Sequence, residues 1–365
     1  MPTKPIDING FSVSLIQSSL LSGDPKSGAN DISVDADPQR YDSGRVFRIR
    51  FEWNPQNPTA AENEALQDDE SWDLSVTALA QILPNLPMQS SILQAQTING
   101  LFTVTSVEPL KLFFLPLPPD LQSIPQASIN SLTCIKQLAE NVDLVTMGKA
   151  STPLVFKHYP AIPDSYDPLL LEAQVFASVD SPYILKMKYV ITDGGCFRGF
   201  LTPHHPYTLA KLLNDKTFPI NWDLKIKWAL SIAEGVAALH SHLAFCGDLR
   251  LENILISEER HLYLIDVGPL NGYCPPYIPP ELDTEHIGVD FHQRTGPRDV
   301  YAVGIIFWAI ATCNGWFGDD EVPRFGWKGD EDTPQWYVEM VNQCLATRPE
   351  ARPSAEELAH RIRRL

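Results

Sequence analysis

The order of apolar and polar residues divides the chain into a strand-rich part followed by a helix-rich part. Residues 45–53 alternate strictly, and Phe47, Ile49 and Phe51 share one face, which predicts a half-buried strand. Residues 22–44 are rich in Gly, Ser, Asp and Pro, and this composition predicts a loop or linker. Shorter apolar runs predict further strands at residues 100–107, 110–115, 132–138, 143–147, 153–159, 185–192 and 197–201.

Helical spacing begins in the second half of the chain. Residues 167–179 predict one helix, and residues 222–240 predict another, in which Leu224, Trp228 and Ile232 recur at a spacing of four. Strands that precede helices in this way predict an α+β fold with a β-rich part and a helical part.

Composition limits the classes of protein that fit this pattern. The 365 residues include 28 Lys and Arg against 45 Asp and Glu, which gives a formal net charge of −17. We expect no nucleic-acid partner, because proteins that bind nucleic acid neutralise its phosphates with clustered basic residues. A hydrophobic content of 44% allows a buried core, and the 31 prolines indicate many breaks between elements.

The stretch between Arg50 and Lys111 contains no Lys or Arg at all. The simplest interpretation of its acidic cluster is a solvated loop, and a docking site for a basic partner is the alternative. The clustered acidic residues are Glu62, Glu64, Asp68, Asp69, Glu70 and Asp73.

Features that would indicate secretion, a membrane or zinc are missing from the sequence. The six cysteines form no C-x-x-C pair, so we expect small core residues rather than zinc ligands. The first ten residues lack the basic start and apolar run of a signal peptide. The apolar run at residues 301–312 is shorter than the roughly 20 residues that a bilayer requires. The expectation is an intracellular, cytoplasmic protein without a membrane partner.

The residues with the clearest chemical pattern lie between 246 and 268. In CGDLRLENILI, Asp248 precedes Asn253 by five residues, on a loop between a helix and an apolar strand. A second apolar strand follows in LYLIDVG and ends at Asp266. A hairpin of these two strands would bring the three oxygen-bearing side chains together. Phosphoryl transfer uses such a set, with hard oxygen ligands for Mg²⁺ and one carboxylate that orients the attacking hydroxyl.

These two segments resemble motifs of the protein kinase family. GDLRLEN resembles the H-R-D-L-x-x-x-N catalytic loop, and DVG resembles D-F-G. Other segments match in the family's order: LVFKHY with Lys157, LLLEAQVF with Glu172, CPPYIPPE with Glu281, the helix DVYAVGIIFW, and a late Arg352 that would pair with Glu281.

The resemblance extends over residues 131–365 and implies a two-lobed, α+β kinase fold. The small, β-rich lobe would comprise residues 131–203 and the helical large lobe residues 204–365. Residues 1–130 would form an N-terminal extension of unknown function that contains strands. A finer resemblance is to divergent fungal kinases that carry such an extension.

The resemblance implies ATP and Mg²⁺ as cofactors and assigns a nucleotide site. Lys157 would bind the α- and β-phosphates and pair with Glu172. The hinge would bond adenine through the Thr202 carbonyl and the His204 amide.

The catalytic roles implied by the resemblance fall on four residues. Asp248 would accept the proton of a protein Ser or Thr hydroxyl, and Arg250 would lie near the γ-phosphate. Asn253 and Asp266 would bind Mg²⁺.

Several departures from the family pattern leave three functions open. The phosphate loop, Gln137–Asp143, contains no glycine, Gly247 replaces an arginine, and Cys274 replaces a threonine. The segment between Asp266 and Glu281 contains no Ser or Thr. The favoured function is an active Ser/Thr kinase. The alternatives are a pseudokinase that acts as a binding or scaffold module, and a small-molecule phosphotransferase, which the short segment would suit.

Overall fold

The computed structural model divides the chain into two compact units, which are described separately. The first comprises Met1–Leu117, Gln126–Tyr166 and Ile191–Arg198, and the second comprises Pro118–Pro125, Asp167–Val190 and Gly199–Leu365. The boundary expected at residue 130 stays a prediction. The structure describes residues 6–8, 10–20, 26–35, 39, 44–68, 71–85, 87, 89–110, 114–139, 141–150, 152–158, 168–267, 275–282, 295–315 and 333–365.

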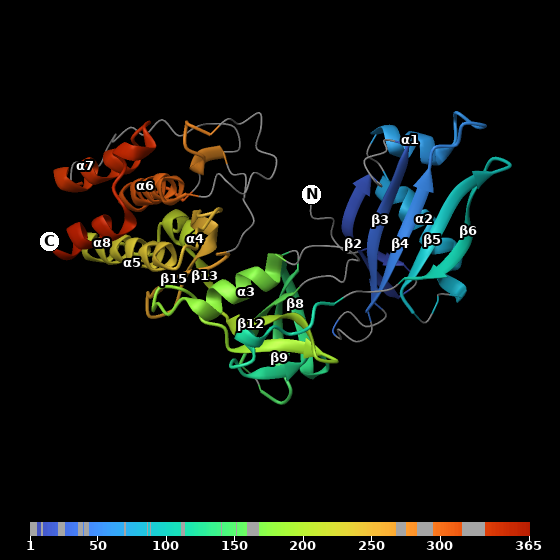
Figure 1. The fold of residues 1–365 in the computed structure, drawn as a ribbon, viewed down its shortest axis with the longest axis horizontal. Helices are drawn as coiled ribbons and strands as arrows, with labels where there is room; N and C mark the ends of the chain where they lie inside the picture. Colours follow the sequence, from blue (N-terminus) through green and yellow to red (C-terminus); the bar gives the residue numbers. More distant parts are fainter. Residues whose placement is uncertain are drawn as a thin grey trace. The chain divides into compact units, whose positions relative to one another are not determined.

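The first unit begins with a six-stranded sheet in the order β1-β2-β3-β4-β5-β6. Neighbouring strands are antiparallel except β4 and β5, which run parallel because two helices connect them. Both helices contact the sheet, as Figure 1 shows in blue and cyan. The elements are β1 (Ile6–Ile8), β2 (Phe11–Leu20), β3 (Ser27–Asp35), β4 (Gly44–Glu52), α1 (Ala61–Asp68), α2 (Ser71–Ile82), β5 (Ser91–Ile98) and β6 (Leu101–Pro109).

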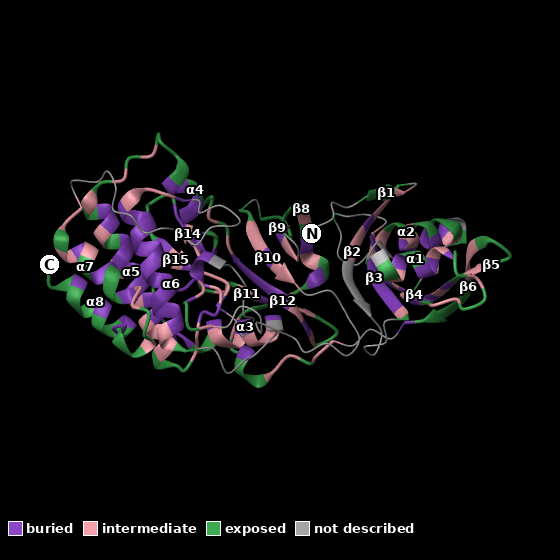
Figure 2. Ribbon diagram, turned by 90° about the horizontal axis from the view of Figure 1, so that it is seen from above, coloured by how far each residue is buried: buried purple, intermediate pink, exposed green. Residues whose placement is uncertain are grey.

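The apolar face of β4 forms the centre of this sheet's core. Phe47 and Ile49 are fully buried, together with Ile32 of β3, Leu79 of α2 and Leu93 of β5. The alternation at residues 45–53 therefore predicted both the strand and its buried face correctly. Figure 2 shows the buried residues of β3 and β4 in purple.

Two predictions for the first unit were wrong. Residues 27–35, expected within a linker, form β3, which pairs with strands on both sides. Its sequence SGANDISVD carries few strand-forming residues, so pairing with β2 and β4 determines its conformation rather than local propensity. The acidic cluster, expected as a solvated loop, falls largely on α1 and α2, and Glu62 is completely buried. Residues 110–115 form no strand at the described positions 110, 114 and 115.

A second six-stranded sheet has the order β7-β11-β12-β10-β9-β8. The strands expected at residues 132–138, 143–147 and 153–159 are confirmed, and the turn after β9 uses Gly148 at a φ of 58°. The strand expected from residue 185 starts later, at Tyr189. The strands are β7 (Gln126–Ser128), β8 (Leu132–Ala139), β9 (Val142–Met147), β10 (Leu154–His158), β11 (Tyr189–Asp193) and β12 (Cys196–Pro203).

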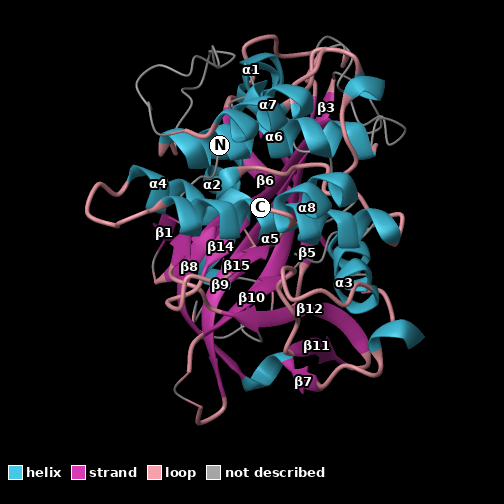
Figure 3. Ribbon diagram, turned by 90° about the vertical axis from the view of Figure 1, so that its left-hand side faces the viewer, coloured by secondary structure: helices cyan, strands magenta, loops and turns pink. Residues whose placement is uncertain are grey.

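The second unit is mainly helical, and Figure 3 shows its helices in cyan. The long helix α5 contacts α6, α8 and strand β15, and Trp228 of α5 and Phe307 of α6 are fully buried. The α+β order expected from the sequence is confirmed. The elements are α3 (Pro168–Ser178), β13 (Tyr207–Thr208), α4 (Leu209–Asn214), α5 (Trp222–Ser241), β14 (Ile254–Ile256), β15 (Leu262–Leu264), α6 (Gly296–Thr312), α7 (Gln335–Cys344) and α8 (Ala355–Arg363). Within the described ranges, every helix is too short or too polar to cross a membrane.

A buried ion pair connects distant segments of the second unit, as the sequence predicted. Both terminal nitrogens of Arg352 donate to the Glu281 carboxylate at 2.6 Å. The Arg352 side chain is 0% exposed and also donates to the carbonyls of Ala346 and Pro297, at 2.9 and 3.0 Å. Because the guanidinium has no access to water, its charge depends on Glu281.

We expect Glu281→Ala to lower the free energy of unfolding of the second unit by about 3 kcal/mol, because it leaves a buried charge without its counter-ion. Thermal or urea unfolding followed by circular dichroism measures the change. The matched control is Glu350→Ala, which removes the partner of exposed Arg348 and should change stability by less than about 1 kcal/mol. Equal melting temperatures for Glu281→Ala and the wild type would show that the pair is not stabilising.

The buried Glu62 joins α1 to the end of β5 in the first unit. Its carboxylate accepts hydrogen bonds from the Thr97 amide at 2.9 Å, the Thr97 hydroxyl at 2.6 Å and the Asn54 amide at 3.2 Å. Burial alone would raise the pKa of Glu62, but these hydrogen bonds outweigh it and hold the pKa below its ordinary value of 4.5. The ionised form is therefore the stabilising one.

Glu62→Gln should destabilise the first unit by about 1–3 kcal/mol at neutral pH, because an amide replaces two charge-assisted acceptors. A lowered carboxyl pKa stabilises the fold above pH 4.5, and this stabilisation disappears as the pH falls through the lowered value. The difference between variant and wild type, measured by urea unfolding, should therefore shrink on acidification. Glu64→Gln, at an exposed position of the same helix, is the control. A difference independent of pH would contradict the assignment.

Candidate active site

The candidate site of the second unit is built on the segment that follows α5. The chain passes through Cys246–Asp248, forms a short turn of 3-10 helix at Leu251–Asn253, and enters the β14–β15 hairpin. Ile254 pairs with Leu264, and the Ile265 amide donates to the Asn253 carbonyl at 3.0 Å. The register of the hairpin therefore places the residue before β14 beside the residues after β15.

This register brings three polar side chains together, as the sequence predicted. Nδ2 of Asn253 lies 2.9 Å from the Asp248 carbonyl, 3.3 Å from Asp248 Oδ2 and 3.4 Å from Asp266 Oδ2. Asp266 adopts a φ of 58°, a left-handed conformation that is unfavourable for a residue other than glycine. Strain of this kind persists only where surrounding structure enforces it and is common in functional sites.

A buried aspartate of α6 holds the turn that carries Asp248. Asp299 accepts hydrogen bonds from the amides of Cys246 at 2.9 Å and Gly247 at 3.3 Å, and its Oδ2 lies 2.9 Å from Nε2 of His240. Gly247 has a φ of 68°, which glycine adopts without strain. The sequence did not reveal this role of Asp299; the only signal was an acidic residue near the start of an apolar helix.

Burial and nearby charges set the electrostatics of Asp248. Burial raises the pKa of Asp248, because desolvation disfavours the carboxylate. Nε of Arg250 lies 3.5 Å from Asp248 Oδ2 and opposes this rise, whereas the negative charge of Asp266 adds to it. A raised pKa makes Asp248 a better proton acceptor than an exposed aspartate, provided that the pH exceeds the pKa.

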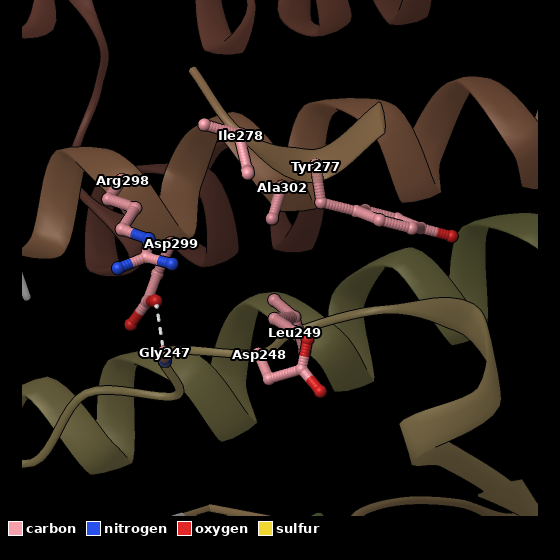
Figure 4. Close-up of a pocket in the computed structure, with 8 residues that line it drawn as sticks. All are labelled: Gly247, Asp248, Leu249, Tyr277, Ile278, Arg298, Asp299 and Ala302. Carbon is pink, nitrogen blue, oxygen red and sulfur yellow. Dashed lines mark hydrogen bonds between the residues drawn. The ribbon is translucent and has the colours of Figure 1, made fainter. Parts of the chain in front are cut away.

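A small pocket opens beside Asp248 on the side of α6. It is lined by Gly247, Asp248, Leu249, Tyr277, Ile278, Arg298, Asp299 and Ala302. Figure 4 shows Arg298 and Asp299 extending from α6 toward the segment that contains Gly247 and Asp248. The Tyr277 hydroxyl accepts a hydrogen bond from the Leu251 amide at 3.3 Å. The sequence did not indicate that Arg298 would be part of this pocket.

The donor atoms of Asn253 and Asp266 suit magnesium that arrives with a nucleotide. Because Nδ2 of Asn253 faces the two aspartates, its Oδ1 is the atom left for a metal. Among the described residues, no group of three or more His, Cys, Asp or Glu is arranged to hold a metal ion. Mg²⁺ commonly binds through one or two protein oxygens while phosphate oxygens complete its coordination, so the pair fits this ion.

The remaining predicted site residues lie on several elements. Lys157 lies on β10 in the first unit, and buried Glu172 lies on α3 in the second, so their pairing stays a prediction. Thr202 is buried near the end of β12, and His204 follows this strand at an exposed position. Arg250, by contrast, is directly beside Asp248.

The turn expected to cover phosphate departs from a glycine-rich loop in the structure as well. It connects β8 to β9 through Asn141, which adopts a φ of 57°. Asp143, expected to repel a nucleotide, is buried, and its carboxylate lies 2.9 Å from Nε2 of His158. The contact with His158 reduces the repulsion expected from Asp143 at this turn. Glu140 and Cys274, to which the sequence also directed attention, lie outside the described residues.

Curated relatives of this chain are similar to it over about half of its length. The probable serine/threonine-protein kinase pats1 of Dictyostelium discoideum is 24% identical over 221 residues, which cover 52% of this chain and 7% of that protein. The serine/threonine-protein kinase kin-29 of Caenorhabditis briggsae is 26% identical over 218 residues, covering 52% of this chain and 25% of that protein. A probable LIM domain-containing serine/threonine-protein kinase of Dictyostelium discoideum is 28% identical over 181 residues, 43% of this chain and 26% of that protein.

The chain thus spans no more than about a quarter of each of these relatives. The finer resemblance to fungal kinases stays a prediction, because these relatives come from an amoeba and a worm. The protein kinase domain family matches residues 155–362, which is more than half of the chain and includes the candidate site. The α+β order and this match confirm the two-lobed kinase fold expected from the sequence. The chain belongs to the protein kinase domain family.

Proposed function

We propose that the chain is an ATP- and Mg²⁺-dependent protein kinase that transfers the γ-phosphoryl group to a protein Ser or Thr hydroxyl. The observation that carries the proposal is the convergence of Asp248, Asn253 and Asp266 within 3.4 Å contacts on one anchored loop. Relatives whose names describe serine/threonine-protein kinases support the choice of acceptor.

In this mechanism, Asp248 orients the acceptor hydroxyl and takes its proton as the hydroxyl oxygen attacks. The carboxylate must be ionised to do so, and the Arg250 guanidinium at 3.5 Å favours the ionised form. Arg250 also presents a positive charge where the transferred group would pass. Its fork of N–H groups can contact two phosphate oxygens, which a lysine cannot do in the same way.

The nucleotide is held by residues from several elements. Lys157 contacts the phosphates and pairs with Glu172, while the Thr202 carbonyl and the His204 amide bond the adenine. Asn253 Oδ1 and the Asp266 carboxylate hold Mg²⁺. When bound, MgATP supplies the phosphoryl group and neutralises much of its charge.

A pseudokinase is the second candidate, and two observations favour it. The β8–β9 turn has Asn141 rather than glycine at its left-handed position, so side chains limit how closely its backbone approaches phosphates. Gly247 leaves the turn before Asp248 without a side chain. Neither observation removes Lys157, Asp248 or Asp266, and we therefore place this candidate second.

Asp248→Asn should reduce phosphoryl transfer by about a hundredfold or more, since an amide cannot accept the proton. The assay follows γ-labelled ATP into the chain itself and into a Ser/Thr peptide array, with Mg²⁺ present. Asp180→Asn is the control, because Asp180 is exposed and paired with exposed Lys186. Equal incorporation by Asp248→Asn and the wild type would overturn the role of Asp248. No incorporation by any form would favour the pseudokinase.

A further inference from the structure

The pocket beside Asp248 contains a buried arginine that the proposed reaction does not use. Arg298 lies in the first turn of α6, directly before Asp299, and is 6% exposed. It lines the pocket together with Gly247 and Asp248. Figure 4 shows its guanidinium on the same side of the pocket as the Asp299 carboxylate.

A guanidinium in such a place needs nearby negative charge, because removing a cation from water is costly. Burial lowers the pKa of Arg298, and the negative charges of Asp299 and Asp248 act in the opposite direction. Asp299 in turn accepts the amides of Cys246 and Gly247. Arg298 therefore lies between a carboxylate that holds the turn and the carboxylate that the turn presents.

The turn contributes no side chain of its own at position 247. Gly247 leaves this side of the loop open, and its amide is bound by Asp299 at 3.3 Å. Apolar Leu249, Ile278 and Ala302 complete the lining of the pocket. Charges interact more strongly beside such apolar groups than in water, so a cation here acts on the turn with little screening.

We infer that Arg298 is a positioning residue, which anchors the turn Cys246–Asp248 to α6 and holds the Asp248 carboxylate in one orientation. The consequence for transfer rests on the role proposed for Asp248. Arg250, the other cation near Asp248, has a side chain that is 37% exposed and is also 3.9 Å from Glu252. The two arginines therefore have different roles, since Arg250 faces the reacting groups and Arg298 supports the loop from behind.

Two substitutions separate the charge of Arg298 from its volume. Arg298→Lys keeps the positive charge, whereas Arg298→Met keeps a long side chain without charge. Hydrogen exchange of the Cys246 and Gly247 amides should accelerate about tenfold or more in Arg298→Met, as expected for loss of one charge-assisted interaction, and stay close to wild type in Arg298→Lys. Arg348→Met, at an exposed site, is the control and should leave these amides unchanged.

A second measurement covers the case that Arg298→Met does not fold. The ¹⁵N resonance of the Arg298 side chain is compared between the wild type and Asp248→Asn. Contact with Asp248 predicts a clear shift of Arg298 Nε and none of Arg348 Nε. Both measurements use the full chain and need no phosphoryl transfer.

The outcomes separate this inference from the proposed function. Where the wild type transfers phosphate, Arg298→Met should lower kcat about tenfold or more with little change in the KM for ATP, and Arg298→Lys should recover most of it. An inactive wild type with accelerated exchange in Arg298→Met would contradict the proposed function alone. Unchanged exchange in Arg298→Met, or equal effects of Met and Lys, would overturn the positioning role.

Discussion

Asp299 fixes the loop on which the proposed chemistry depends. One carboxylate, buried at the start of α6, accepts the amides of Cys246 and Gly247 and contacts the ring of His240 at the end of α5. The turn before Asp248 is thereby tied to both central helices of the second unit. The hairpin register then places Asn253 and Asp266 against Asp248. A loop with this many constraints can hold its functional groups without help from the rest of the chain.

Buried charges recur around α6, and each has a compensating partner. Arg352 pairs with Glu281 and also donates to the carbonyl of Pro297, which lies in the first turn of α6. Lys225 of α5 donates to the Ala311 carbonyl at 2.6 Å, near the other end of the same helix. Unpaired charges would be costly in this apolar surrounding, so these contacts specify where α6 lies. The position of α6 in turn determines the position of the Asp248 turn.

The sequence predicted the site better than it predicted the first unit. The spacing of Asp248, Asn253 and Asp266 around two apolar strands was sufficient, because hairpin pairing is a local consequence of the chain. Strand β3 and helices α1 and α2 were missed, since their form depends on pairing and burial that local composition does not reveal. Glu62 is the clearest case: an acidic residue in a charged cluster suggests solvent, yet hydrogen bonds from Thr97 and Asn54 compensate its burial. Likewise, Arg298 and Asp299 gained a role only through folding.

Nucleotide binding tests the central claim most directly, because it does not depend on finding a substrate. Calorimetric titration of the full chain with ATP should show binding with a dissociation constant below about 1 mM when Mg²⁺ is present, in the range usual for enzyme substrates. Binding should weaken clearly when Mg²⁺ is chelated, since Asn253 and Asp266 hold the nucleotide through the ion. The absence of binding at millimolar ATP with Mg²⁺ would contradict the account, and so would binding that ignores Mg²⁺.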